Sequence, residues 1–142
     1  RQLAQSVRVM RPGGILCVEV PNDFNRLQRA ICATRPPTTD APWWVNPVHL
    51  NYFTFSSLER LLASTGFEPV RREATYPMEW FLLQGVDYVG DDTLGRHCHQ
   101  KRMAFEAGLE HGGLRDLRQS FSRWLASEQI GREAVVYARR VS

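Results

Sequence analysis

The pattern of apolar and polar positions predicts a helix, a tight turn and a strand at the start of the chain. Apolar residues recur at helical spacing over 3–10, and Pro12 cannot continue that helix. Gly13-Gly14 supply the turn, and residues 15–20 are nearly all apolar. A strand without alternation is expected to be covered on both faces, as in a parallel, doubly wound sheet. The residues after it would then lie at the carboxyl end of a strand, where such sheets bind ligands.

The next segment is expected to hold a short helix and a long loop. Asn22 or Asp23 is placed to cap a helix around residues 27–31, because short polar side chains accept hydrogen bonds from a first helical turn. Residues 34–48 lose all periodicity and are rich in proline. A loop of that length is typical of a lid, a binding segment or disorder, and the adjacent Trp43 and Trp44 argue against disorder.

A helix and a strand with clear boundary signals follow this loop. Ser56 with Glu59 three residues later predicts a capped helix start, and Gly66 predicts the end of that helix. A strand is expected over 68–75, interrupted early by Pro69.

The second half of the chain is mainly helical in its pattern. We expect an apolar helix over 80–89, longer helices over 94–109 and 114–125, and a final strand over 133–140. Helices outweigh strands, and the strands are too few for a free-standing doubly wound sheet.

The composition is typical of one soluble globular domain. The chain has 142 residues, of which 43% are hydrophobic, and no apolar run approaches the roughly 20 residues of a membrane span. It begins at Arg1 without a signal-peptide pattern, and we expect it to be a piece of a longer protein that lacks the amino-terminal part. Three cysteines without tight spacing fit a reducing compartment, so a cytoplasmic location is expected.

The charge of the chain does not by itself indicate a nucleic-acid partner. The net charge is +3, but the arginines are scattered among acidic residues and form no stripe. No nucleic-acid-binding motif is present, and Trp43-Trp44 is the one candidate stacking platform. We therefore expect neither a nucleic-acid nor a membrane partner.

Four segments are informative through their order and spacing. They are Arg11-Pro12-Gly13-Gly14 leading into 15–20, the stretch 47–54 around His49, the helix 57–62 followed by Gly66-Phe67, and Ile130-Gly131-Arg132-Glu133 leading into 135–137. Together they resemble the carboxyl-terminal half of bacterial-type class I S-adenosylmethionine-dependent methyltransferases. The resemblance covers essentially the whole chain and implies that residues 1–142 are the carboxyl-terminal segment of one methyltransferase domain.

This resemblance implies a fold and a function. The fold would be α/β, namely a partial Rossmann-like methyltransferase fold that holds the last strands of the sheet, with a helical insertion. The function would be S-adenosylmethionine-dependent methylation of a small-molecule acceptor such as a sugar or polysaccharide precursor. The alternative is a non-catalytic binding or assembly module that retains half of the fold.

The cofactor-binding part of the resembled family has no counterpart in the chain. Arg11-Pro12-Gly13-Gly14 comes before a strand, whereas nucleotide-binding glycine loops follow a strand and open a helix. The cofactor-binding residues are therefore unknown, and the isolated chain is expected to be inactive. Its expected partners are the acceptor, the missing amino-terminal half of the domain and, through an unpaired strand edge, a second copy in a homodimer.

His49 is the candidate catalytic base. Methylation of a hydroxyl or amine requires removal of a proton, for which histidine is suited at neutral pH. In a sugar-methylating branch of the resembled family, a histidine in a similar His-x-x-Tyr-Phe setting acts as the base. The alternative is that His49 only fixes the loop through backbone hydrogen bonds.

Five further residues are candidates for acceptor binding. Asn22 and Asp23 could bind hydroxyl groups, or could simply cap the next helix. Trp43, Trp44 and Tyr52 could form the wall of an acceptor pocket, because aromatic faces suit sugar rings and cations, or the tryptophans could anchor the loop to the core.

Other charged or metal-ligating residues form no defined site in the sequence. His97-Cys98-His99 is not expected to bind a metal, because side chains two apart on a helix point about 160° away from each other. Arg96 and Arg102 could hold an anionic group of the acceptor, although solvent exposure is the simpler interpretation. Carboxylates at 79, 87, 91 and 92 do not have the spacing of a defined acid/base pair.

Overall fold

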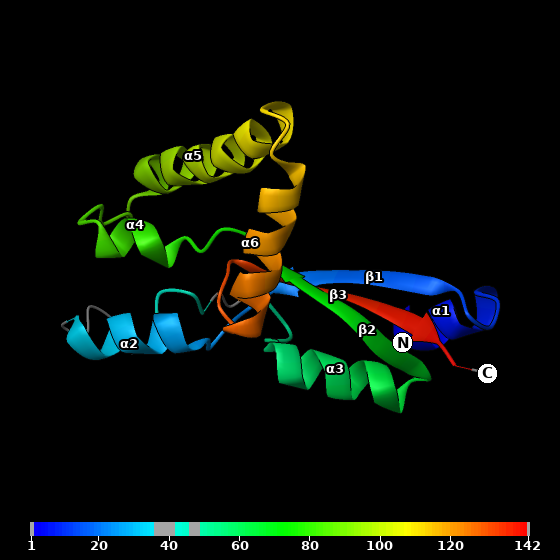
Figure 1. Cartoon of the computed structure of the whole chain (residues 1–142). Helices are drawn as coiled ribbons and strands as arrows, with labels where there is room; N and C mark the ends of the chain where they lie inside the picture. The colour runs from blue at the N-terminus through cyan, green and yellow to red at the C-terminus, as the bar shows by residue number, and fades with distance from the viewer. Residues whose placement is uncertain (1, 36–41, 46–48, 142) are drawn as a thin grey trace.

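The computed structural model describes residues 2–35, 42–45 and 49–141, which form a mixed α/β structure (Figure 1). The mixed α/β class predicted from the sequence is confirmed. The elements in chain order are α1 (Gln2–Val9), β1 (Ile15–Pro21), α2 (Arg26–Thr34), α3 (Phe55–Ser64), β2 (Phe67–Ala74), α4 (Glu79–Leu83), α5 (Asp92–His111), α6 (Arg115–Ser127) and β3 (Glu133–Arg140).

The three strands form one sheet in the order β1-β3-β2, and β3 is antiparallel to both neighbours. Val18 faces Val136, and Ala74 faces Ala134. The expectation that β1 belongs to a parallel ladder is therefore wrong for the strand pairs described. The reason is that the last strand of the chain inserts between β1 and β2, which run parallel to each other but share no hydrogen bonds.

One face of the sheet carries the main hydrophobic core. Its central strand contributes Ala134, Val136 and Ala138, which are fully buried. Helix α3 packs Phe55, Leu58 and Leu62 into the same cluster. Partly buried residues of α1 and β1, with Met10 between them, pack against this cluster: Leu3, Val7, Met10, Leu16, Val18 and Val20.

The opposite face of β1 is not covered by the described residues, contrary to the prediction. Ile15 is 52% exposed, and Cys17 and Glu19 are also exposed. Burial along β1 alternates residue by residue, because successive side chains point to opposite faces. The nearly continuous apolar run over residues 15–20 led to the prediction that both faces of β1 are covered, whereas the described residues cover only one face.

Helix starts differ from the prediction by one to three residues. Helix α2 is capped by Asn25, whose side chain accepts hydrogen bonds from Leu27 N and Gln28 N at 3.0 Å each. Neither Asn22 nor Asp23 caps it. Helix α3 is capped by Thr54 with Ser57 as its reciprocal partner, and not by Ser56 with Glu59. Both sites contain runs of small polar residues, and the direction of the incoming chain selects the one that caps.

The helix predicted over 80–89 is much shorter in the structure. Helix α4 ends at Leu83, because Gly85 adopts a positive φ of 81° and Val86 N donates back to Phe81 O at 2.9 Å. The final strand, predicted over 133–140, is confirmed with the same boundaries.

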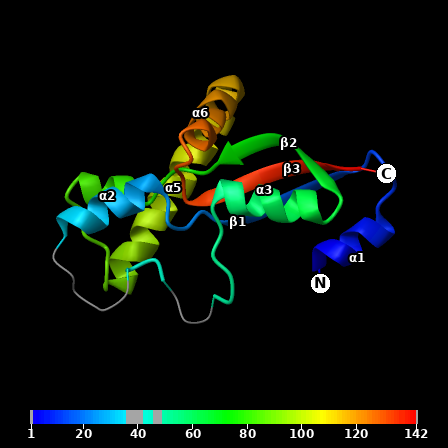
Figure 2. The same cartoon turned by 90° about the horizontal axis from the view of Figure 1, so that it is seen from below.

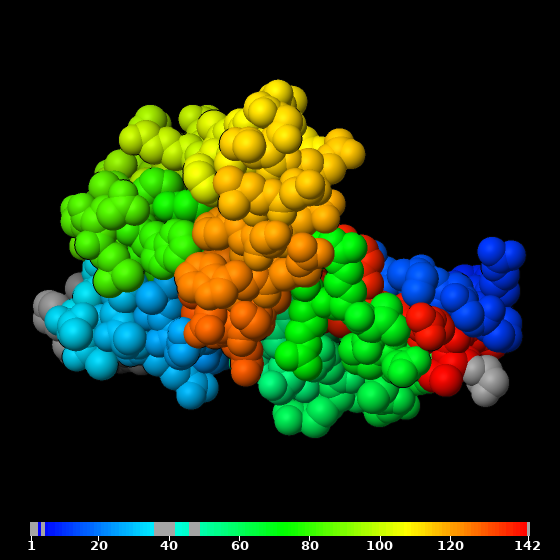
Figure 3. Space-filling model, in the orientation of Figure 1, coloured from blue at the N-terminus to red at the C-terminus, as the bar shows by residue number. Residues whose placement is uncertain are grey.

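Strands β1 and β2 end, and β3 begins, at the same end of the sheet, whereas both termini lie at the other end (Figures 1 and 2). Helices α2, α4 and α5 lie beyond the end of the sheet at which β1 and β2 finish (Figure 1). Figure 3 shows α4 above α2 there, with α5 above α4. Of the helices described, none has the length and apolar character needed to cross a bilayer.

The turn that leads into β3 depends on Gly131. This buried residue has φ +123°, and a Cβ there would lie 2.7 Å from both Ala74 Cβ and Thr75 O. We expect Gly131→Ala to lower the free energy of unfolding by at least about 2 kcal/mol, measured by urea denaturation. Gly108→Ala on α5 is the control: nothing lies within 4 Å of its Cβ, and helix propensity predicts a gain of about 1 kcal/mol. Equal effects of the two substitutions would contradict this assignment.

Candidate functional site

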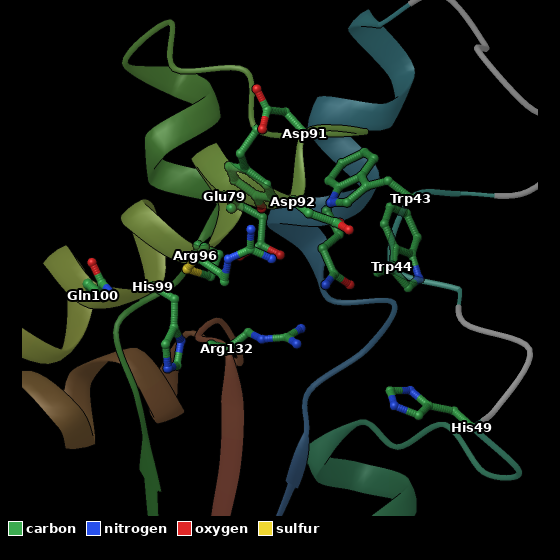
Figure 4. Close-up of a pocket in the computed structure, with 14 residues that line it drawn as sticks. Trp43, Trp44, His49, Glu79, Asp91, Asp92, Arg96, His99, Gln100 and Arg132 are labelled. Carbon is green, nitrogen blue, oxygen red and sulfur yellow. The ribbon is translucent and has the colours of Figure 1, made fainter.

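A cavity of about 610 Å³ lies beyond the carboxyl end of β1 (Figure 4). Its volume is within the roughly 300–1,000 Å³ of small-molecule sites. Residues from α2, α4, α5, the tryptophan loop and the turn before β3 line it: Gln28, Trp43, Trp44, His49, Met78, Glu79, Tyr88, Asp91, Asp92, Gly95, Arg96, His99, Gln100 and Arg132.

Glu79 brings a buried carboxylate to this cavity. It is the first residue of α4 and only 2% exposed. Burial raises its pKa, while a backbone hydrogen bond and one from the Gln28 side chain oppose the rise. Its Oε2 has no hydrogen-bond partner among the described residues. The sequence analysis noted this carboxylate but gave it no role, since its burial depends on the packing of α4 against α2.

Asp23 is a second buried carboxylate, which acts electrostatically on Glu79 but is not among the residues that line the cavity. It follows β1, is 2% exposed, and its backbone N donates to Phe53 O at 2.8 Å. Burial raises its pKa, and electrostatic interactions with Arg132 and with His49 oppose the rise. Its negative charge in turn raises the pKa of Glu79, so the two carboxylates are electrostatically coupled.

Arg132 is the cation that the two carboxylates share. Its charge lowers the pKa of both Asp23 and Glu79. The turn before β3 fixes its backbone: Arg132 N donates to Thr75 O at 3.2 Å, and Asn22 N donates to Arg132 O at 3.0 Å. The sequence analysis quoted this residue only as part of a motif. No local signal reveals its role, because residues more than a hundred positions apart meet here.

His49 lines the cavity on the side away from Arg96 and His99 (Figure 4). It interacts electrostatically with Asp23, and its ring centroid lies 6.1 Å from that of Tyr52. The structure thus brings together His49 and Asp23, which the sequence analysis proposed separately.

The tryptophan pair forms one wall of the cavity. The two indole rings meet edge to face at 4.7 Å, and Trp44 is buried. Arg35 lies over the outer ring, 5.8 Å from the Trp43 centroid. Residues 42–45 are described, whereas 36–41 and 46–48 of the predicted loop lie outside the described residues. Tyr52 is not a lining residue; it packs against Phe24, which also contacts Trp44.

Asn22 has a mainly structural set of contacts. Its Nδ2 donates to Gln129 O at 3.1 Å and to Gly131 O at 3.3 Å, and its own carbonyl accepts from Asn25 Nδ2 at 2.9 Å. It lines a separate cavity of about 360 Å³ and not the one beside Glu79. Its predicted role in substrate binding remains a prediction.

The two arginines considered for anion binding have different surroundings. Arg96 lines the cavity. Arg102 is 4% exposed and donates to Glu133 at 2.9 Å, so the expectation of solvent exposure is wrong for this residue. The ion pair links α5 to Glu133, the first residue of β3. In the ranges described, no three potential metal ligands converge.

The raised pKa of Glu79 predicts a pH-dependent difference between wild type and Glu79→Gln. The ordinary pKa of a glutamate side chain is 4.5, and burial raises the pKa of Glu79 in the native state above it. As pH rises past 4.5, the unfolded chain therefore loses this proton before the native state does. Ionisation therefore lowers the free energy of unfolding as pH rises from 4.5. Because glutamine has no proton to lose, urea denaturation should show the variant gaining stability relative to wild type over that range. The matched control is Glu68→Gln, an exposed residue of β2, for which we expect no trend. A flat difference for Glu79→Gln would show that its carboxylate is as well solvated as in the unfolded chain.

Comparison with known proteins does not assign this site. No protein-family model matches the chain, and no curated protein is significantly similar to it in sequence. What the site can do therefore follows from its own groups: two buried carboxylates, a shared arginine, a histidine and an aromatic wall.

Proposed function

We propose that the chain forms the acceptor-binding part of an S-adenosylmethionine-dependent methyltransferase that acts on a small polar molecule. The observation that carries the proposal is that His49 and Arg132 both line the cavity beyond β1 and both interact electrostatically with the buried Asp23 carboxylate. A partial Rossmann-like fold is part of the same proposal, since β1 and β2 run parallel and are joined by helices.

The position of the site supports this proposal. In open α/β sheets, ligands bind outside the carboxyl ends of the parallel strands. Strands β1 and β2 both end beside the cavity; Glu79, which follows β2, supplies its buried lining carboxylate, and the buried Asp23 follows β1.

The chemistry of His49 supports the proton-transfer step. A neutral imidazole that lines the cavity can accept the proton of an acceptor hydroxyl, which leaves the oxygen as the nucleophile. The nearby Asp23 carboxylate stabilises the imidazolium that forms. The charge of Arg132 opposes the rise in the pKa of Asp23 that burial causes.

The described residues do not fit the cofactor that the resemblance implies. Strand β1 is followed by Asn22-Asp23-Phe24-Asn25 and then α2, without a glycine-rich turn. The Asn25 side chain already occupies two of the free N–H groups of α2. The proposal for this chain is therefore confined to acceptor binding and proton removal.

A non-catalytic binding or assembly module is the second candidate function. The absence of a glycine-rich turn between β1 and α2, and the structural contacts of Asn22, favour it. A cytoplasmic location belongs to both proposals, and the free thiols at Cys17, Cys32 and Cys98 support a reducing compartment.

The 142-residue chain is expected not to bind S-adenosylmethionine by itself. Isothermal titration calorimetry should detect no saturable binding, because the described residues provide no loop for the cofactor. A dissociation constant near 1 μM, about −8 kcal/mol, would contradict this expectation.

In the natural protein that contains this chain, His49→Ala should lower the turnover of S-adenosylmethionine-dependent methylation by roughly 10²–10⁴. Product formation from radiolabelled cofactor is the measurement, under conditions where chemistry limits the rate. His97→Ala is the control, since His97 is exposed on α5 and does not line the cavity. Turnover within a few-fold of wild type would assign His49 a structural role, and a wild type without methyl transfer would favour the binding module.

A further inference from the structure

One carboxylate oxygen of Glu79 is buried without a hydrogen-bond donor among the described residues. Its carboxylate is 2% exposed, lines the cavity, and leaves Oε2 without a hydrogen-bond donor among the residues described. A buried polar group without a partner is costly, and more so when it is charged. The nearest contributions from the protein are a Gln28 hydrogen bond and the charge of Arg132, which Asp23 shares.

The cavity is acidic although the chain as a whole is basic. Its lining carboxylates are Glu79, Asp91 and Asp92, against the guanidinium groups of Arg96 and Arg132. The negative charge of Asp23, which does not line the cavity, also acts on Glu79. The net charge of the whole chain is +3, so the excess of carboxylates over guanidinium groups in the lining is opposite in sign to the charge of the chain. Such a cavity favours a positively charged ligand.

The aromatic wall suits the same kind of ligand. Cations interact favourably with the faces of indole and phenol rings. Trp43, Trp44 and Tyr88 line the cavity together with Glu79, and Trp43 already carries the Arg35 guanidinium on one side. A carboxylate together with aromatic walls is a recognised arrangement for an organic ammonium group.

We infer that the cavity binds an organic molecule with a protonated amino group, with the ammonium seated on the Glu79 carboxylate between the aromatic wall and the acidic rim. The ammonium donates to Oε2 and gives the buried carboxylate a counter-charge. A neutral hydroxyl would supply only the hydrogen bond and not the charge. This inference rests on the proposed function only in identifying that molecule as the methyl acceptor, whose reacting hydroxyl would face His49.

The test compares D-glucosamine with D-glucose, which share a ring and differ in one amino group. Isothermal titration calorimetry on the 142-residue chain, at a pH where the amino group is protonated, should show glucosamine binding at least about tenfold more tightly. Glu79→Gln should abolish the preference, and Glu68→Gln should leave it intact. Equal binding of the two sugars, no binding of glucosamine at millimolar concentration, or an unchanged preference in Glu79→Gln would overturn the inference.

Asp92→Asn keeps the test decisive if Glu79→Gln does not fold. Asp92 is an exposed lining residue, so its substitution leaves the core intact and should reduce the preference by a few-fold. An undiminished preference in this variant would count against an acidic rim. Tight glucosamine binding without methyl transfer by the natural protein would refute only the proposed function. Methylation of a neutral acceptor without glucosamine binding would refute only the inference.

Discussion

The pairing of β3 with both β1 and β2 is the interaction on which the rest of this structure depends. It buries Ala134, Val136 and Ala138 at the centre of the core and joins residues from the two ends of the chain. Because β3 lies between β1 and β2, the inward-facing backbone N–H and C=O groups of both strands form hydrogen bonds with β3. The same pairing sets Arg132, at the start of β3, beside the residues that follow β1.

The site is built from this junction and not from any single segment. Asn22 Nδ2 donates to the carbonyl oxygens of Gln129 and Gly131 in the turn before β3, and these bonds fix the direction in which β1 leaves the sheet. Asp23 follows immediately and is buried for that reason. On the other side, β2 leads through Thr75, whose carbonyl binds Arg132 N, toward Glu79. Two carboxylates therefore become buried around one arginine.

Burial changes the acid–base properties of the Asp23 and Glu79 carboxylates. Each has a pKa raised by desolvation, each is influenced by Arg132, and each has one oxygen without a partner in the described part of the chain. Residues in this condition are commonly found at functional sites. A ligand that supplies the missing donors would stabilise the ionised carboxylates, and His49 lines the same cavity.

Several elements were determined by the sequence alone, because their signals are local. The periodicity of 3–10, the turn at Gly13-Gly14, the stop at Gly66 and the strand Glu133–Arg140 depend on side-chain spacing and on backbone conformations that nearby residues dictate. The sequence also predicted a site at the end of β1, and the family resemblance singled out His49; both remain predictions.

Only the tertiary structure decided which strands pair, which face of β1 is covered and which charged residues share a site. An apolar strand has the same pattern whether one face is covered or two, so the exposure of Ile15 could not be inferred. Glu79 and Arg132 lie more than fifty residues apart, and no sequence motif contains both of them. Their coupling arises from burial and long-range pairing, which belong to the folded chain and have no counterpart in local sequence.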